Sequence, residues 1–225
     1  MKITLPYGRT GLELELPDSV NVIRGLPEAP LADPAGAIAS ALERPIESAP
    51  LRELVKDKDR VAIVHSDITR ATPNGLILPP ILESLGAAGV PDGNITLINA
   101  TGMHRAQTDA ELRAMLGDDI VARYRIVQHD SRDAATLVRA GTTYTGNGLY
   151  LNRAWMEADF RIATGFIEPH FFAGYSGGPK AVLPGIAGEP SILYNHRASN
   201  IDHPRATWGV TGGNPVWEEM AEASK

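Results

Sequence analysis

The sequence contains no cysteine. Disulfide bridges and thiolate-bound metal ions are therefore excluded from its chemistry. Any metal ion must be held by imidazole or carboxylate side chains, or by donor atoms that a bound ligand brings with it.

Excess positive charge and long apolar runs are also missing. The formal net charge is -6 at pH 7, which argues against nucleic acid as the main partner because phosphate backbones require basic patches. No apolar run reaches the roughly 18 residues that suggest a membrane-spanning helix, and the first residues lack the apolar stretch of a signal peptide. We therefore expect a cytoplasmic protein that binds neither nucleic acid nor membranes.

What the sequence does contain is an alternation of strand and helix patterns along 225 residues, enough for one α/β domain over 1–225. Buried strands are predicted at 60–65, 94–99, 124–128 and 160–164, and helices at 34–42, 51–55, 72–88, 108–116 and from 214 onward. This order predicts a Rossmann-like parallel or mixed sheet with helices on both faces. Alternating residues at 2–5 and 12–16 predict an N-terminal β-hairpin before it.

Two helix starts carry specific signals. Thr108 and Glu111 form a capping-box pattern. Thr72 followed by Pro73 predicts an N-cap with proline at the first helical position, and the Pro79–Pro80 pair is expected to kink that helix or delay its start.

Chemistry-bearing residues follow the predicted strands directly. Segments 67–70, 101–105 and 165–180 each begin just beyond a predicted strand end. In open α/β sheets, ligands bind in the crevice outside the carboxyl ends of the strands. The three segments are therefore expected to meet at one crevice.

The most distinctive segment is HFFAGYSGGPK, from His170 to Lys180. Its glycines remove Cβ atoms that would keep a phosphate or a planar ring away from the backbone. Pro179 and Ala181 flank Lys180, so the segment is not a nucleoside-triphosphate loop, which needs Gly before and Ser or Thr after the lysine. The glycine spacing also fails the dinucleotide fingerprint.

Individual side chains allow more than one interpretation. Arg70 suits a carboxylate or phosphate ligand, although a local ion pair with Asp67 would also explain it. A lysine whose stem is buried, as we expect for Lys180, has a lowered pKa and can act as a nucleophile or attachment point. His65, His129 and His203 are read as structural or surface residues, in contrast to His104, His170 and His196.

Together, Asp67-x-x-Arg70, Gly102-Met-His104-Arg105, His170 with Gly-Gly-Pro-Lys180, and His196 resemble the N-terminal domain of the nickel-dependent lactate racemase family. The resemblance spans roughly residues 60–200 and rests on the order and spacing of the motifs. It implies a nickel-pincer nucleotide as cofactor, in which nickel is bound by a pyridinium-3-thioamide-5-thiocarboxylate mononucleotide. It also implies a small 2-hydroxy acid as substrate, and separate proteins that synthesise the cofactor.

The resemblance assigns a role to each matching residue. Lys180 corresponds to the lysine that holds the cofactor covalently, and His196 to the nickel ligand. His104 and His170 correspond to a pair of general bases, with Asp67 and Arg70 as polar catalytic residues of the pocket. Further cofactor contacts are expected from Gly177, Gly178, Asp67 and Thr69.

The implied reaction is racemisation by reversible hydride transfer. Removing the α-proton of a 2-hydroxy acid gives a very poor carbanion beside a carboxylate, whereas moving a hydride gives a planar keto acid. One base is needed for each enantiomer, and imidazole titrates near neutrality. Because members of the family are longer and have a second domain, we expect this chain to be a half-site with little activity alone.

Three alternatives remain from the residues themselves. The substrate could be another 2-hydroxy acid, such as malate or a sugar acid. The chain could be a carrier that holds the cofactor without catalysis, although a carrier does not need both His104 and His170. A zinc hydrolase using His104, His170 and His196 is the third reading, and it leaves Lys180 unexplained.

Overall fold

The computed structural model describes residues 1–8, 10–23, 25 and 28–225. They divide into two compact units, Met1–Ala32 and Asp33–Lys225, which are described separately. Sequence analysis treated the chain as one domain, and the α/β architecture is that of the second unit.

The first unit contains the predicted hairpin. Strands β1 (Lys2–Leu5) and β2 (Leu12–Glu15) pair antiparallel, with Ile3 opposite Leu14. The predicted turn between them includes Arg9, which lies outside the described residues.

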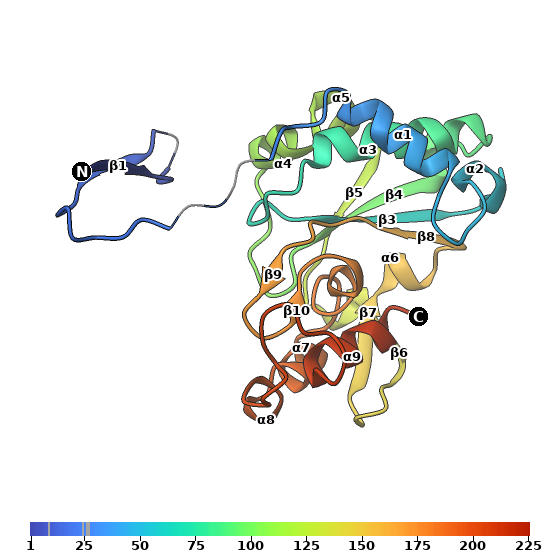
Figure 1. The fold of residues 1–225 in the computed structure, drawn as a ribbon. Helices are drawn as coiled ribbons and strands as arrows, with labels where there is room; N and C mark the ends of the chain where they lie inside the picture. Colours follow the sequence, from blue (N-terminus) through green and yellow to red (C-terminus); the bar gives the residue numbers. More distant parts are fainter. Residues whose placement is uncertain (9, 24, 26–27) are drawn as a thin grey trace. The chain divides into compact units, whose positions relative to one another are not determined.

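The second unit is built on a four-stranded parallel sheet in the order β5-β4-β3-β8 (Figure 1). Its strands are β3 (Val61–Ser66), β4 (Ile95–Ala100), β5 (Arg125–Gln128) and β8 (Phe160–Ala163). All four were predicted from their apolar, β-branched runs. The fold class expected from the sequence is confirmed.

Alternate residues of each strand face opposite sides of this sheet, and each side has its own core. Val61 and Ile63 belong to one buried cluster, whereas Ala62 and Val64 belong to the other. Figure 1 shows α1, α3, α4 and α5 on one side and α6, α7 and α9 on the other. Burial on both faces is what a parallel sheet with near-continuous apolar strands requires.

The first cluster is covered by helices that match the predictions or extend them. They are α1 (Pro34–Glu43), α2 (Leu51–Leu54), α3 (Asn74–Ala87), α4 (Asp109–Leu116) and α5 (Asp118–Arg123). Thr108 and Glu111 form the predicted capping box at the start of α4. Helix α5 was not predicted.

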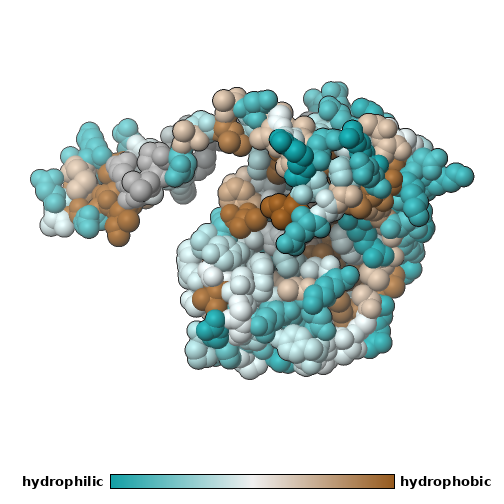
Figure 2. Space-filling model, turned by 45° about the vertical axis from the view of Figure 1, so that its right-hand side comes forward, coloured by the Kyte–Doolittle hydropathy of each residue, from teal (hydrophilic) through white to brown (hydrophobic). Residues whose placement is uncertain are grey.

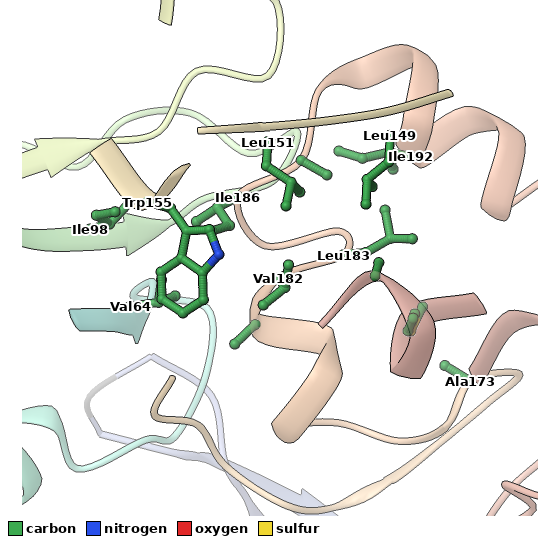
Figure 3. Close-up of a cluster of buried hydrophobic side chains, with 14 of the residues drawn as sticks. Val64, Ile98, Leu149, Leu151, Trp155, Ala173, Val182, Leu183, Ile186 and Ile192 are labelled. Carbon is green, nitrogen blue, oxygen red and sulfur yellow. The ribbon is translucent and has the colours of Figure 1, made fainter. Parts of the chain in front are cut away.

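The side of the second cluster is occupied by segments that follow β5 in the chain. They are η2 (Ala134–Thr136), β6 (Leu137–Thr142), β7 (Gly148–Asn152), α6 (Arg153–Met156), β9 (Pro169–His170), β10 (Gly174–Tyr175), η3 (Gly178–Ala181), α7 (Glu189–Asn195), α8 (Ala198–Ile201) and α9 (Pro215–Ala223), where η marks a short 3-10 helix. One further 3-10 helix, η1 (Asp92–Asn94), precedes β4. Figure 3 shows Trp155 of α6 among Val64 and Ile98 of the sheet and Ile186 and Val182. This packing holds the chain that follows Lys180 against the sheet.

The start of α3 differs from the prediction. Pro73, not Thr72, is the N-cap, because the Thr72 hydroxyl instead donates to Ser66 Oγ at 2.9 Å. The helix begins at Asn74 and contains Pro79 and Pro80 in its interior, so the proline pair does not delay its start. Four apolar side chains of α3 are buried against the sheet and offset the backbone hydrogen bonds that the prolines cannot make; these are Leu78, Ile81, Leu82 and Leu85.

Helix α9 begins as predicted, with the Asn214 side chain accepting from the backbone of Val216 and Trp217. Its Glu219 is completely buried. The carboxylate accepts from Thr143 Oγ1 at 2.7 Å and from Asn195 Nδ2 at 2.6 Å, and so joins α9 to the β6–β7 hairpin and to α7.

No helix in the described part of the chain is both long and apolar enough to cross a membrane. The molecular face drawn in Figure 2 is mainly hydrophilic or neutral, with hydrophobic residues in small separate groups.

Gly174 and Gly178 provide a test of how tightly the loop around β10 is built. Both have left-handed φ values, +74° and +52°. A Cβ at Gly174 would lie 2.3 Å from the Val210 carbonyl oxygen, whereas a Cβ at Gly178 would meet nothing within 4 Å.

Gly178→Ala is expected to lower the free energy of unfolding by about 1–2 kcal/mol, from φ strain alone. Gly174→Ala should cost a further 1–3 kcal/mol or so from overpacking. Urea unfolding of both variants measures the difference, and equal losses would contradict this close contact.

Candidate functional site

A cavity of about 260 Å³ lies at the carboxyl ends of β3, β4 and β8. It is lined by Ser66, Asp67, Arg70, Ala100, Thr101, Gly102, Met103, His104, Thr164, Gly165, Phe166, His170, Phe172, Ser176, Gly177, Lys180, Ala181, Pro184, Gly185, Ile192 and His196. The three segments predicted to converge therefore do so. This follows from the parallel sheet, whose strand ends open onto one edge.

His104 is held by a buried carboxylate. Its Nδ1 lies 2.7 Å from Asp67 Oδ2, and Asp67 is only 2% exposed. The other carboxylate oxygen, Oδ1, accepts from Thr69 Oγ1 at 2.6 Å and from the Thr69 backbone N–H at 3.3 Å. With Nδ1 committed to Asp67, Nε2 is the ring nitrogen left for a ligand.

His170 stands at the end of β9 with its Nδ1 accepting from the Ala173 backbone N–H at 3.3 Å. Its ring contacts Phe172 edge-on, with centroids 4.7 Å apart. Burial lowers the pKa of His170 to about 4, with further lowering by the positive charges of Lys180 and Arg70. The imidazole is therefore neutral at pH 7.

Lys180 lies in η3 with its Nζ 5.8 Å from the centre of the Phe172 ring. Burial lowers the pKa of Lys180 to about 7; Arg70 acts in the same direction and Glu168 opposes both. The sequence predicted a buried stem and a lowered pKa at this residue, and the structure shows both. About half of the Lys180 amines are then neutral at pH 7.

His196 is the C-cap residue of α7. Burial lowers the pKa of His196 to about 4, with a further contribution from Lys180. Its ring packs edge-on against Phe172 at 5.2 Å between centroids, and its buried Nδ1 has no hydrogen-bond partner in the described part of the chain. A neutral imidazole of this kind can coordinate a metal ion.

Arg70 lines the cavity and lies 3.9 Å from Glu168. Arg70 therefore pairs with Glu168 and not with Asp67, the partner that the alternative reading of the sequence gave it. Both side chains are partly exposed, at 35% and 44%, so the pair is weak and leaves the guanidinium accessible to an anion.

Two residues predicted to bind a cofactor do not line the cavity. Thr69 is outside the lining and instead donates to Asp67. Gly178 opens η3 and faces away from the cavity, whereas its neighbour Gly177 lines it. The glycine pattern alone could not distinguish these two neighbours, because only the turn geometry decides which one faces the ligand.

Phe172, which lines the cavity, and Glu168, which pairs with a lining residue, were not predicted from the sequence. Phe172 packs against His170 and His196, and Glu168 pairs with Arg70. Phe172 lies within the His170–Lys180 motif, and that position was the available signal.

The remaining histidines lie outside the cavity lining. His129 is buried and its Nε2 bonds the Ala187 carbonyl oxygen at 2.9 Å. His65 is completely buried in β3, and His203 is exposed. Within residues 1–8, 10–23, 25 and 28–225, no group of three His, Asp or Glu side chains is placed to hold a metal ion, so the three-histidine zinc site receives no support.

The chain is similar to curated lactate racemases. It is 38% identical to the lactate racemase of Thermoanaerobacterium thermosaccharolyticum over 99% of this chain and 53% of that protein. It is 40% identical to the lactate racemase of Lactiplantibacillus plantarum over 84% of this chain and 44% of that protein. The chain thus spans about half the length of the curated relatives that it matches.

Solved structures give the same result. The lactate racemase apoprotein of T. thermosaccharolyticum superposes with a TM-score of 0.84 at 37% identity, over 99% of this chain and 52% of that one. A Thermotoga maritima protein superposes with a TM-score of 0.66 at 25% identity, over 85% of this chain and 46% of that one. Residues 7–209 match the family model described as "Lactate racemase N-terminal domain". A chain with this fold, this cavity and these relatives belongs to the lactate racemase N-terminal domain family.

Proposed function

We propose that this chain supplies the cofactor and proton-transfer half of a 2-hydroxy acid racemase, with lactate as the first candidate substrate. The observation that supports this most directly is one cavity lined by His104, His170, Lys180 and His196. The named relatives are lactate racemases of about twice the matched length. We therefore propose the racemase activity for a longer protein that contains this chain and supplies the remaining residues of the active site.

The residues of the cavity fit the nickel-pincer nucleotide. Lys180, with a pKa near 7, has a neutral amine available for a covalent thioamide link. His196 is neutral and offers imidazole as a nickel ligand, and its buried Nδ1 without a partner is the kind of orphaned polar atom that a bound group or water explains. Gly177 allows close approach at the cavity wall. When bound, this cofactor would supply a reversible acceptor for hydride.

The chain's own residues would handle the carboxylate and the protons. Arg70 is accessible at the cavity and suits the substrate carboxylate. His104, oriented by Asp67, would accept the hydroxyl proton at Nε2 while the Asp67 carboxylate stabilises the resulting imidazolium. His170 would be the second acid–base group.

The proposal also implies partners and a location. A chain of this kind requires proteins that synthesise the cofactor, and that synthesis fits a cytoplasmic setting. The retention of both His104 and His170 in one cavity favours a catalyst over a cofactor carrier.

Covalent attachment can be tested by mass. Intact-mass spectrometry and nickel analysis of the chain produced together with the cofactor-synthesising proteins should show an adduct on Lys180 and nickel near one per chain. Lys180→Ala is expected to lose both, while Lys58→Ala, at an exposed lysine, keeps them. A bare polypeptide mass without nickel, in this chain and also in a longer protein that contains it, would refute the cofactor assignment.

The lowered pKa of Lys180 predicts unusual reactivity without any cofactor. A lysine with a pKa near 7 is about half neutral at pH 7, whereas an ordinary lysine is neutral to the order of 0.1% or less. Because only the neutral amine reacts, trace acylation of Lys180 should rise through pH 7 and reach a plateau above pH 8. Peptide mass spectrometry of the same sample compares it with exposed Lys58. Equal labelling rates at pH 7 would contradict the burial effect.

The acid–base role of His104 predicts a loss of turnover without a loss of cofactor. In a longer protein that contains this chain, His104→Ala should lower the rate of racemisation by about 10²–10⁴-fold and leave the mass adduct and nickel content unchanged. His203→Ala, at an exposed histidine outside the cavity, is the matched control. Assays with lactate, malate and sugar acids, followed by chiral chromatography, identify the substrate. Full activity in His104→Ala would exclude this residue as the base.

A further inference from the structure

His104 is fixed in one tautomer by its partner. Asp67 Oδ2 lies 2.7 Å from Nδ1, and Oδ1 of the same carboxylate already accepts from the Thr69 hydroxyl and backbone N–H. An ionised carboxylate can only accept hydrogen bonds. The Nδ1 atom must therefore carry the proton, which leaves a lone pair on Nε2 when the ring is neutral.

His170 is fixed in the opposite tautomer. The group facing its Nδ1 is the Ala173 backbone N–H, at 3.3 Å, which can only donate. Ala173 is completely buried, so protonating Nδ1 would leave that N–H without a hydrogen-bond partner, which is unfavourable. Burial and the nearby charges of Lys180 and Arg70 also keep the ring neutral. Its single proton must therefore be on Nε2.

Contacts within the loop that carries His170 oppose a flip of its ring. The ring lies edge-on to Phe171 and Phe172, with centroids 6.1 Å and 4.7 Å away. His170 also pairs with Gly174 across the β9–β10 hairpin, and Gly174 is packed against Val210. A flip would replace Nδ1 by a carbon and break the bond to Ala173.

We infer that the two cavity histidines are held in opposite tautomers, with His104 as the resting proton acceptor and His170 as the resting hydrogen-bond donor. The tautomer assignment refines the proposed function, and the role of the tautomers in catalysis rests on that function. The substrate O–H bond would break towards His104 Nε2, the new N–H bond would form there, and the electron pair would stay on the oxygen. His170 would donate from Nε2–H to a substrate oxygen, and it could act as a base only after giving up its bond to Ala173.

The test is an NMR measurement of the histidine ring nitrogens in the chain without cofactor. Long-range ¹H–¹⁵N correlation at neutral pH, on protein labelled at its six histidines, distinguishes protonated from unprotonated ring nitrogens. His104→Gln and His170→Gln assign the two rings. We expect His104 as the Nδ1–H form and His170 as the Nε2–H form. The same tautomer in both rings, or rapid averaging between tautomers in either ring, would overturn the inference.

A matched pair of variants tests whether the Asp67 carboxylate sets the tautomer of His104. Asp67→Asn should move the His104 signals towards a mixture of tautomers and leave those of His170 in place. Asp109→Asn, at an exposed aspartate on α4, should change neither. Unchanged His104 signals in Asp67→Asn would contradict the role of the carboxylate.

The outcome is independent of turnover. A chain that never racemises a hydroxy acid would still show opposite tautomers if the inference holds. A working racemase with identical tautomers would overturn the inference alone.

Discussion

Strand β3 is hydrogen-bonded in parallel on both sides, to β4 and to β8. Parallel pairing forces neighbouring strands to end at the same edge. Asp67, the segment that carries His104, and the chain that leads to His170 therefore emerge side by side although they are far apart in the sequence. The arrangement of the cavity depends on this pairing, because the hydrogen bond between Asp67 and His104 spans two strand ends.

The second constraint is the concentration of basic groups in a partly dry cavity. Lys180 and Arg70 both contribute to lowering the pKa of His170, and Lys180 contributes to lowering that of His196, in addition to burial. Burial, with this repulsion added to it, keeps both imidazoles neutral, and a neutral imidazole is the form that can bind a metal ion or accept a proton. The same repulsion favours a negatively charged ligand.

The sequence predicted the central sheet well, because apolar β-branched runs such as 60–65 are typical of strands buried on both faces by helices. It also predicted which segments meet. It missed the β6–β7 hairpin, where Gly141 interrupts the strand pattern with a bulge, and the two-residue strands β9 and β10, which are set by tertiary contacts. Thr72 looked like a cap, but a hydroxyl partner on β3 competed for it. Thr69 and Gly178 were selected for their place in a motif, whereas only the backbone path decides which side chains reach the cavity.

One aromatic ring connects the principal groups of the cavity. Phe172 lies 4.7 Å from the His170 ring, 5.2 Å from the His196 ring and 5.8 Å from Lys180 Nζ. Residues that share a packing partner do not respond independently to substitution. The three polar positions therefore form an epistatic unit, in which the effect of changing one depends on the identity of the others.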